Sequence, residues 1–174
     1  MSVTCADHVE HPPVALEYRR ASDDDRGAIE TICDRAIGET IVDAFGQTHD
    51  ILGAINLLAE SDGSLAGILS LVVSAGELTV IFLSVYPEFQ GSGVGAGLLK
   101  AADAFAAERG LTFLRVTVTN DDMPLLYFFQ RHGFTIYEVA VGEVADRFGA
   151  ATPGFSGIPS RDEIRMRRAV CARG

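Results

Sequence analysis

The residues best suited to chemistry in this chain are the closely spaced glycines of one segment, Gln90-Gly91-Ser92-Gly93-Val94-Gly95-Ala96-Gly97. An apolar run from Leu78 to Val85 precedes them, and apolar residues at helical spacing follow as far as Arg109. A strand that turns through glycines into a helix presents several free backbone N–H groups at the positive end of the helix dipole. Because glycine has no Cβ, a phosphate can approach such a backbone closely. The segment therefore predicts an anion-binding loop suited to a pyrophosphate.

Three interpretations of this segment must be separated. Read as Gly-x-Gly-x-x-Ala from Gly91, it fits a dinucleotide-binding fingerprint, which requires a glycine directly after the strand and an acidic residue about 20 positions later. Five residues intervene before Gly91, however, and the next strand carries Arg115 where the acid is required. Read as Gln-x-x-Gly-x-Gly from Gln90, the segment fits a different phosphate loop. A purely structural turn is the third interpretation.

A second group of polar residues follows the next predicted strand, Leu111 to Thr119. Asn120, Asp121 and Asp122 supply N-cap side chains, and Pro124 suits the first turn of a helix. The short helix that follows is rich in leucine and phenylalanine, and it ends before Gly133-Phe134.

These two segments resemble the two signature blocks of the N-acetyltransferase (GNAT) superfamily, whose coenzyme A loop reads Gln-x-x-Gly-x-Gly. The resemblance extends over roughly Val14 to Val170, and its specific motifs lie between residues 78 and 134. It implies an α/β (α+β) fold with a mixed, mostly antiparallel sheet of six to seven strands and about four helices. It also implies acetyl-CoA as the cofactor and a single domain over residues 14–174, after a flexible tail at residues 1–13.

The resemblance assigns residues to the binding of coenzyme A. The expected contacts are Leu83, Ser84, Val85, Gln90, Gly91, Ser92, Gly93, Val94, Gly95, Ala96, Asn120 and Phe129. The asparagine is expected to contact the pantetheine arm, and a backbone N–H near Val85 to stabilise the oxyanion. Because both substrates can be held side by side, direct attack by a primary amine needs neither a covalent intermediate nor a metal.

The general base has several candidates. A primary amine, with a reference pKa of about 10.4, must lose a proton before it attacks. Glu77 begins the central strand where some relatives carry a catalytic glutamate, but counting back from Gln90 places the equivalent position at Thr79. Glu77 lies two residues away and so shares the same strand face. Asp162 and Glu163 are the alternatives.

The leaving-group acid is also open. The superfamily usually places a tyrosine four residues before the glycine of the second block, and here that position is Phe129. Counting seven residues from Asn120 instead gives Tyr127. The two side chains point roughly 200° apart on a helix, so only one can face the thioester sulfur. We expect Phe129 to do so, and Tyr127 is kept as the candidate acid.

The walls of an acceptor pocket are expected from two regions, the segment Glu39 to Ile51 and the long connection Gly142 to Arg161. The first is predicted to form a short second helix and a loop, and the second shows no clear element. Candidate acceptor contacts are Asp43, His49, Asp50, Arg147, Arg161, Asp162 and Glu163.

The other elements follow from hydrophobic periodicity. A first strand is predicted over Val14 to Arg20, and a helix after Ser22 whose buried face carries Ile29, Ile32, Cys33 and Ile37. Further strands are predicted over Ile55 to Glu60, Leu65 to Ser74, Phe134 to Val139 and Ile164 to Val170.

Bulk properties narrow the functional classes. The 174 residues fit one domain, and a net charge of -10 disfavours nucleic acid as a partner. No apolar run predicts a membrane span, and three scattered cysteines, Cys5, Cys33 and Cys171, fit a cytoplasmic location without a metal or disulfide cluster. A homodimer stays open. We expect an N-acetyltransferase that acts on a small-molecule or protein amine. A non-catalytic acyl-CoA-binding or regulatory module is the alternative, and a nicotinamide-dependent oxidoreductase is a distant third.

Overall fold

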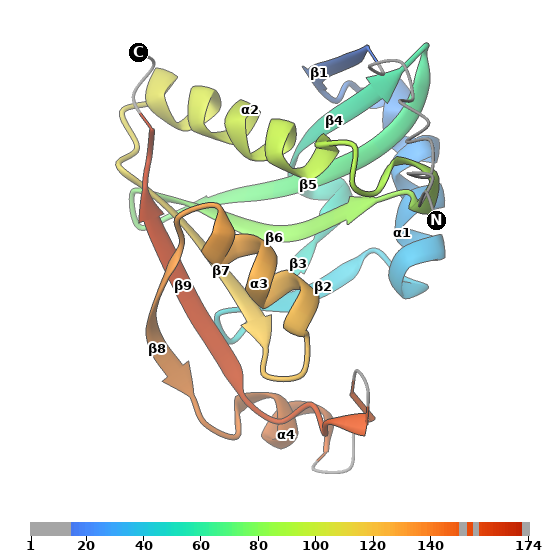
Figure 1. Ribbon diagram of the computed structural model, residues 1–174. Helices are drawn as coiled ribbons and strands as arrows, with labels where there is room; N and C mark the ends of the chain where they lie inside the picture. Colours follow the sequence, from blue (N-terminus) through green and yellow to red (C-terminus); the bar gives the residue numbers. More distant parts are fainter. Residues whose placement is uncertain (1–14, 150–152, 155–156, 172–174) are drawn as a thin grey trace, which may run out of the picture.

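A seven-stranded sheet with helices on both faces forms the body of the protein (Figure 1). The computed structural model describes residues 15–149, 153–154 and 157–171. The sheet contains β1 (Leu16–Arg20), β4 (Ile55–Ser61), β5 (Ser64–Ser74), β6 (Glu77–Val85), β7 (Phe113–Thr119), β8 (Thr135–Ala140) and β9 (Glu163–Ala169), and a separate hairpin contains β2 (Ile41–Ala44) and β3 (Gln47–Asp50). The helices are α1 (Arg26–Ile37), α2 (Val94–Glu108), α3 (Met123–Arg131) and α4 (Glu143–Phe148).

The strands follow the order β1-β4-β5-β6-β7-β9-β8. Every neighbouring pair is antiparallel except β6 with β7. The predicted mixed, mostly antiparallel sheet with about four helices is therefore confirmed, as is the hairpin of β4 and β5. No helix among the described residues is long and apolar enough to cross a membrane.

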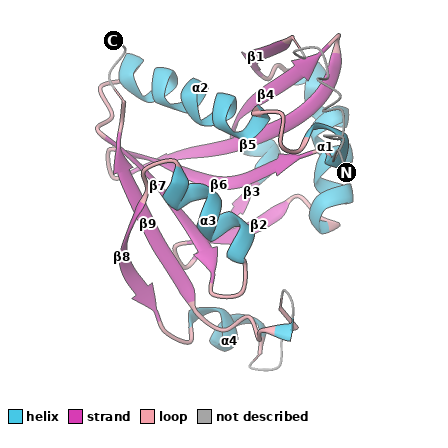
Figure 2. Cartoon of the chain, in the orientation of Figure 1, coloured by secondary structure: helices cyan, strands magenta, loops and turns pink. Residues whose placement is uncertain are grey.

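Side chains of the central strands alternate between two hydrophobic cores. Leu57 and Leu69 pack under α2 and α3, whereas their neighbours Leu58 and Ile68 pack under α1 on the other face. Figure 2 shows α2 and α3 on the near side of the sheet and α1 on the far side. Helices cover both faces of β6, so its successive side chains from Leu78 to Phe82 are all buried. This explains why its sequence is a continuous apolar run and does not alternate between apolar and polar residues.

The sheet opens between its two parallel strands. β6 and β7 pair only where Leu78–Val80 lies beside Leu114–Val116. Beyond that point β6 continues to Val85 along β5, whereas β7 continues to Thr119 along β9. β6 also carries a bulge, because Ser70 and Leu71 of β5 face Phe82 and Val80, which leaves Ile81 without an opposite residue. The divergence of the strands exposes backbone and side chains in the middle of the fold.

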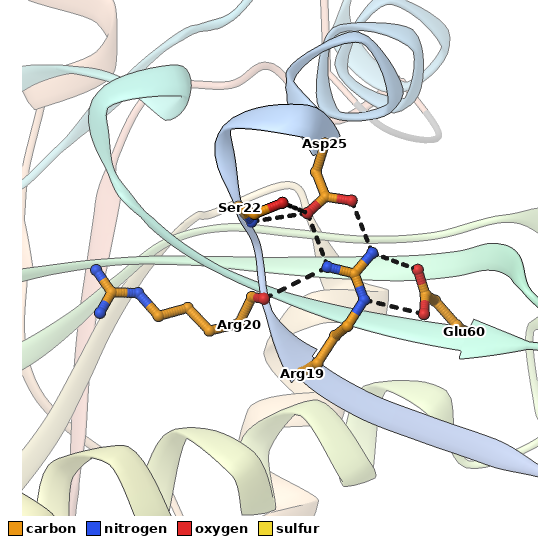
Figure 3. Close-up of polar contacts among 5 residues, drawn as sticks. All are labelled: Arg19, Arg20, Ser22, Asp25 and Glu60. Atoms are coloured by element: carbon orange, nitrogen blue, oxygen red, sulfur yellow. Dashed lines mark hydrogen bonds and ion pairs between the residues drawn. The ribbon is translucent and has the colours of Figure 1, made fainter.

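A cluster of charged groups fixes β1 to β4 and to the start of α1 (Figure 3). The Arg19 guanidinium donates to both carboxylate oxygens of Asp25, each at 2.7 Å, and to those of Glu60 at 2.6 and 3.0 Å. Asp25 also accepts from the backbone N–H and hydroxyl of Ser22, which confirms the predicted helix start there. The hydrogen bonds from Arg19 hold the pKa of Asp25 well below its usual range.

The segment from Glu39 to Ile51 was predicted as a short helix and loop, and that prediction is wrong. It forms the β2–β3 hairpin, followed by a single 3-10 turn at Ile51–Gly53. Phe45 and Gly46 form the two-residue turn and have positive φ values of 54° and 69°. A two-residue turn with positive φ at both positions matches the right-handed twist of the two strands that it joins. Gly46 adopts a positive φ without cost. Phe45 also has a positive φ, which is unusual for a residue other than glycine.

Three further predictions are corrected or limited by the structure. Ile37 is 44% exposed rather than buried, because α1 ends there and the chain turns away at Gly38. The connection Gly142 to Arg161 contains the short helix α4. The expected tail, residues 1–13, lies outside the described residues, as do Val14 and Cys5.

Candidate active site

A groove runs along the glycine segment, between the end of β6 and one face of α3, and we call it the glycine groove. Its volume is about 710 Å³. The predicted coenzyme A contacts that line it are Leu83, Ser84, Val85, Gln90, Gly91, Gly93, Val94, Gly95 and Ala96. Residues that are distant in the sequence, on the strand and on α3, are thus brought to the glycines.

The beginning of α2 provides the groove with hydrogen-bond donors. The first bond of the helix runs from the N–H of Gly97 to the carbonyl of Gly93, at 3.0 Å. The N–H groups of Val94, Gly95 and Ala96 therefore have no partner inside the helix. Gly93 has φ 89°, and a Cβ built there would meet no atom within 4 Å. Gly93 and the three residues that carry these donors all line the glycine groove. The local geometry fits the anion-binding loop that the sequence predicts.

The α3 face of the groove was missed by the sequence analysis. Pro124, Leu125, Phe128, Arg131 and His132 line it. Their spacing of three or four residues marks one face of a helix, and this signal could have identified them. The beginning of α2 approaches α3 closely, because a Cβ at position 95 would lie only 3.0 Å from the Phe128 ring. A glycine there lets the groove form between the two helices.

A second cavity, of about 270 Å³, lies where β6 and β7 diverge, and we call it the split cavity. The bulged part of β6, Val80 to Leu83, forms one side, and Val116 and Thr117 of β7 form the other. The end of α1, β2 and α3 complete the lining. Because Leu83 and Leu125 line both the split cavity and the glycine groove, the two spaces are neighbours across these side chains.

Phe129 and Tyr127 lie on different sides of α3. Phe129 is 1% exposed, packs edge-on against Phe134 and lines the split cavity. Tyr127 is 63% exposed, and its hydroxyl accepts a hydrogen bond from Arg131 at 2.9 Å. Of the two, Phe129 is the one that lines the split cavity, and its expected position beside the sulfur stays a prediction.

Asn120 ends β7 and fastens it to the segment before β9. Its side-chain carbonyl accepts from the N–H groups of Arg161 and Asp162 at 2.7 and 2.8 Å, and its amide donates to the carbonyl of Pro159 at 3.0 Å. Its expected contact with a pantetheine arm stays a prediction. Ser92, whose hydroxyl donates to the carbonyl of Phe89, lies in the same turn as the groove glycines.

Each of the three predicted bases is paired with an arginine, and Glu163 accepts from Nε of Arg165 at 2.8 Å. Glu77 lies at the start of β6, with a carboxylate oxygen 3.6 Å from Arg115, whose Nε donates to the hydroxyl of Thr79. Asp162 accepts from Arg161 at 2.8 Å and from the backbone N–H of Gly142. The hydrogen bond from Arg161 is the main reason that the pKa of Asp162 is lowered. None of the three candidate bases, Glu77, Asp162 and Glu163, is in the lining of the split cavity or the glycine groove.

Asp43 is the predicted acceptor contact that the structure places in the split cavity. Its Oδ1 lies 2.8 Å from Nη1 of Arg147 and accepts from the hydroxyl of Thr48 at 2.7 Å. Because Arg147 lies on α4, the ion pair joins the hairpin to the connection before β9. The backbone N–H of Phe45 adds a second link by donating to Glu163 at 3.2 Å. Both regions expected to form the acceptor wall therefore meet here.

Comparison with known proteins gives one family match and several relatives. Residues 18–134 match the model of the acetyltransferase (GNAT) family. Streptothricin acetyltransferase of Streptomyces lavendulae is 37% identical over 103 residues, which are 58% of this chain and 49% of that protein. The chain thus spans about half the length of this curated relative.

Solved structures give the same fold. Nourseothricin acetyltransferase superposes with a TM-score of 0.65 at 25% identity, covering 90% of this chain and 99% of the other. A Bacillus anthracis protein, described as a putative streptothricin acetyltransferase and crystallised with acetyl coenzyme A, superposes with a TM-score of 0.69 at 15% identity. That superposition covers 91% of this chain and 99% of the other.

Proposed function

The chain belongs to the acetyltransferase (GNAT) family, and on this premise we propose that it transfers an acetyl group from acetyl-CoA to a primary amine. The observation that carries the proposal is the pairing of two neighbouring spaces, the glycine groove and the split cavity, which share Leu83 and Leu125. The glycine groove suits the phosphates of a cofactor, and the split cavity beside it is where its thioester and an acceptor would meet. A reaction between two bound substrates requires this side-by-side arrangement.

Acetyl-CoA is proposed for the glycine groove. The free N–H groups of Val94, Gly95 and Ala96 would bind the pyrophosphate at the start of α2, where the helix dipole favours negative charge. Arg131, which also lines the groove, adds a positive side chain near these phosphates. The B. anthracis relative was crystallised with this same ligand, which supports the choice.

When bound, acetyl-CoA supplies a thioester whose carbonyl carbon forms a C–N bond with the amine as its C–S bond breaks. The ammonium gives up two protons in all, one to the sulfur and one to solvent. The backbone of β6 would stabilise the negative charge on the carbonyl oxygen, with donors near Val85 or at the unpaired bulge residue Ile81. Ile81 lines the split cavity, and Val85 lines the glycine groove.

Proton transfer is proposed through water, because the lining of neither space includes Glu77, Asp162 or Glu163. Each carboxylate stays a candidate base on that route. With Phe129 facing the split cavity, the thiol leaves without a neighbouring acid, which its reference pKa of about 8.5 permits near neutral pH. Tyr127 is the proposed acid only if α3 rotates on binding.

Thermal melting with separate additions of acetyl-CoA, CoA, NADH and NADPH tests the cofactor. A ligand at 100 times its dissociation constant stabilises the folded chain by about 2.7 kcal/mol, which gives a measurable shift in Tm. We expect a shift with the two CoA species alone. A shift with NADPH and none with CoA would reject the proposal.

Release of CoA thiol from acetyl-CoA tests the transfer itself. We expect release to depend on an added amine, and mass spectrometry to show the acetylated amine. A screen of alkyl amines, diamines, amino acids and streptothricin supplies the acceptors, the last because of the S. lavendulae relative. CoA binding without release in any of them would favour the alternative, a non-catalytic acyl-CoA-binding module.

A further inference from the structure

We infer that Arg131 binds the 3′-phosphate of coenzyme A and thereby selects coenzyme A over its dephosphorylated form. Arg131 would have this role only with acetyl-CoA in the glycine groove, so the inference rests on the proposed function. Three features of the groove support it: the order of its residues along α3, the charge of its lining, and the contacts of the Arg131 side chain.

The residues of α3 that line the glycine groove give it a direction. Leu125 lies at the end that the groove shares with the split cavity, where the thioester is proposed to react. Phe128 follows nearly one turn later and lies beside the first turn of α2, because a Cβ at position 95 would be 3.0 Å from its ring. Arg131 follows nearly another turn later, about 9 Å along the helix axis from Leu125.

The order of the groups in coenzyme A matches this direction. The thioester lies at one end of the molecule and the pyrophosphate in the middle, and the ribose with its 3′-phosphate follows toward the adenine end. With the thioester in the split cavity, the pyrophosphate would meet the free N–H groups of Val94, Gly95 and Ala96. The ribose phosphate would then reach the part of the groove that Arg131 lines.

The charge of the groove differs from that of the chain as a whole. Among the residues that the structure describes, the lining of the groove contains no acidic side chain, although the chain has a net charge of -10. A phosphate monoester carries about -1.5 to -2 charges at pH 7, more than either phosphate of the pyrophosphate. It therefore gains most from a nearby guanidinium such as that of Arg131.

The Arg131 guanidinium is held by a neighbour and keeps donors for a phosphate. Its Nη1 donates to the hydroxyl of Tyr127 at 2.9 Å, one turn back on α3. No carboxylate within the described part of the chain pairs with it. A guanidinium has five N–H donors in a planar fork that matches the oxygens of a phosphate. Tyr127 therefore positions Arg131, which gives the exposed tyrosine a role other than proton transfer.

Coenzyme A and 3′-dephospho-CoA form a matched pair of ligands, because they differ only by the 3′-phosphate. Arg131 is exposed, so water and salt screen its charge and the effect on binding is moderate. We expect the wild type to bind coenzyme A about tenfold more tightly than 3′-dephospho-CoA at low salt. The ratio of the two dissociation constants should fall as salt is added.

Calorimetry measures both dissociation constants for the wild type and for variants of Arg131. Arg131→Ala should bind the two ligands within about twofold of each other, because only coenzyme A loses a partner. Arg131→Lys keeps the charge without the planar fork, so we expect a preference of about threefold. Arg26→Ala removes the same charge from α1, on the opposite face of the sheet (Figure 2), and should keep the preference of the wild type.

Tyr127→Phe tests the positioning of Arg131. The variant removes the hydroxyl that accepts from Nη1 and keeps the ring. We expect the preference for coenzyme A to fall to about threefold, while the affinity for 3′-dephospho-CoA is unchanged. If Tyr127 only supported the fold of α3, both affinities would fall alike and the preference would stay.

Three results would overturn the inference and leave the proposed function standing. Equal affinities of the wild type for the two ligands would show that the 3′-phosphate is not bound. An equal loss of both affinities in Arg131→Ala would show that Arg131 contacts the pyrophosphate instead. A preference that survives in Arg131→Ala would assign the 3′-phosphate to another group. If the wild type binds neither ligand, the proposed function and the inference fail together.

Discussion

Phe129 and Tyr127 lie two residues apart on α3 and have opposite surroundings. The Phe129 ring lines the split cavity and packs against Phe134, whereas the Tyr127 hydroxyl bonds to Arg131 at the protein surface. A rotation of about 200° along the helix separates two such positions, so one face cannot present both. The ring that lines the split cavity therefore carries no hydroxyl, and that Phe129 lies beside the thioester stays a prediction.

Tyr127→Phe tests this assignment of the two rings. Because the Tyr127 hydroxyl faces away from the split cavity, we expect kcat to change less than about twofold, measured by release of CoA thiol. Removal of a group that donates a proton in the transition state costs about 100-fold or more. A loss of that size would show that α3 turns Tyr127 toward the sulfur.

Gly93→Glu tests the anion site at the start of α2. Gly93 has a left-handed φ of 89°, and its surroundings are open, so a glutamate would place negative charge where the phosphate is proposed to bind. We expect the affinity for CoA, measured by calorimetry, to fall by at least about 100-fold.

The matched control for this change is Gly93→Asn, because asparagine tolerates the left-handed conformation and carries no charge. We expect it to bind CoA within about tenfold of the wild type. If both variants bind like the wild type, the glycine groove does not hold the pyrophosphate.

Asp25 should control how the free energy of unfolding depends on pH under acid conditions. Its pKa in the folded chain is lowered by Arg19, while in the unfolded chain it titrates near about 3.9. The stabilisation is therefore present above pH 4 and is lost as the pH falls through the pKa of the folded state. Urea unfolding at pH 5 and pH 3 should show a smaller difference for Asp25→Asn than for the wild type.

Asp24→Asn is the control for this measurement, since Asp24 is an exposed acid of the same turn. It should keep the pH dependence of the wild type. If Asp25→Asn keeps it as well, the cluster drawn in Figure 3 does not contribute to stability in acid.

The cysteines should differ in reactivity. Burial raises the pKa of the Cys33 thiol to about 11, and Asp50 adds to the effect, whereas Cys171 is exposed. Alkylating reagents attack the thiolate, so we expect iodoacetamide to label Cys171 in the native protein and Cys33 only after unfolding. Peptide mass spectrometry measures the extent of labelling at each of the two cysteines. Equal labelling in the native state would show that α1 opens locally.

The elements recovered from the sequence are those whose cause is local. The apolar run before the glycines predicted β6, and Asp122, whose side chain accepts from the N–H of Leu125, marked the start of α3. The glycine turn into α2 was also predicted, because glycines between a strand and a helix leave free donors whatever the rest of the chain does. In each case a few neighbouring residues are sufficient to predict the element.

The β2–β3 hairpin was missed because its strands are short and only half-buried, so their apolar pattern is weak. Its polar contacts outside the hairpin are to distant residues, the ion pair of Asp43 with Arg147 and the bond from Phe45 to Glu163. No pattern within residues 39–51 contains those partners. The role of Asp43 in the cavity wall therefore became visible only in the folded chain.

By itself the sequence determined the fold class, the glycine loop and the helices that flank it, since these depend on backbone geometry and local periodicity. Only the tertiary structure shows the split cavity, where we propose that the acceptor meets the thioester. The split cavity exists because β6 and β7 pair over Leu78–Val80 and then separate, each following a different neighbour. That divergence is set by the register of strands far apart in the chain, which no short segment encodes.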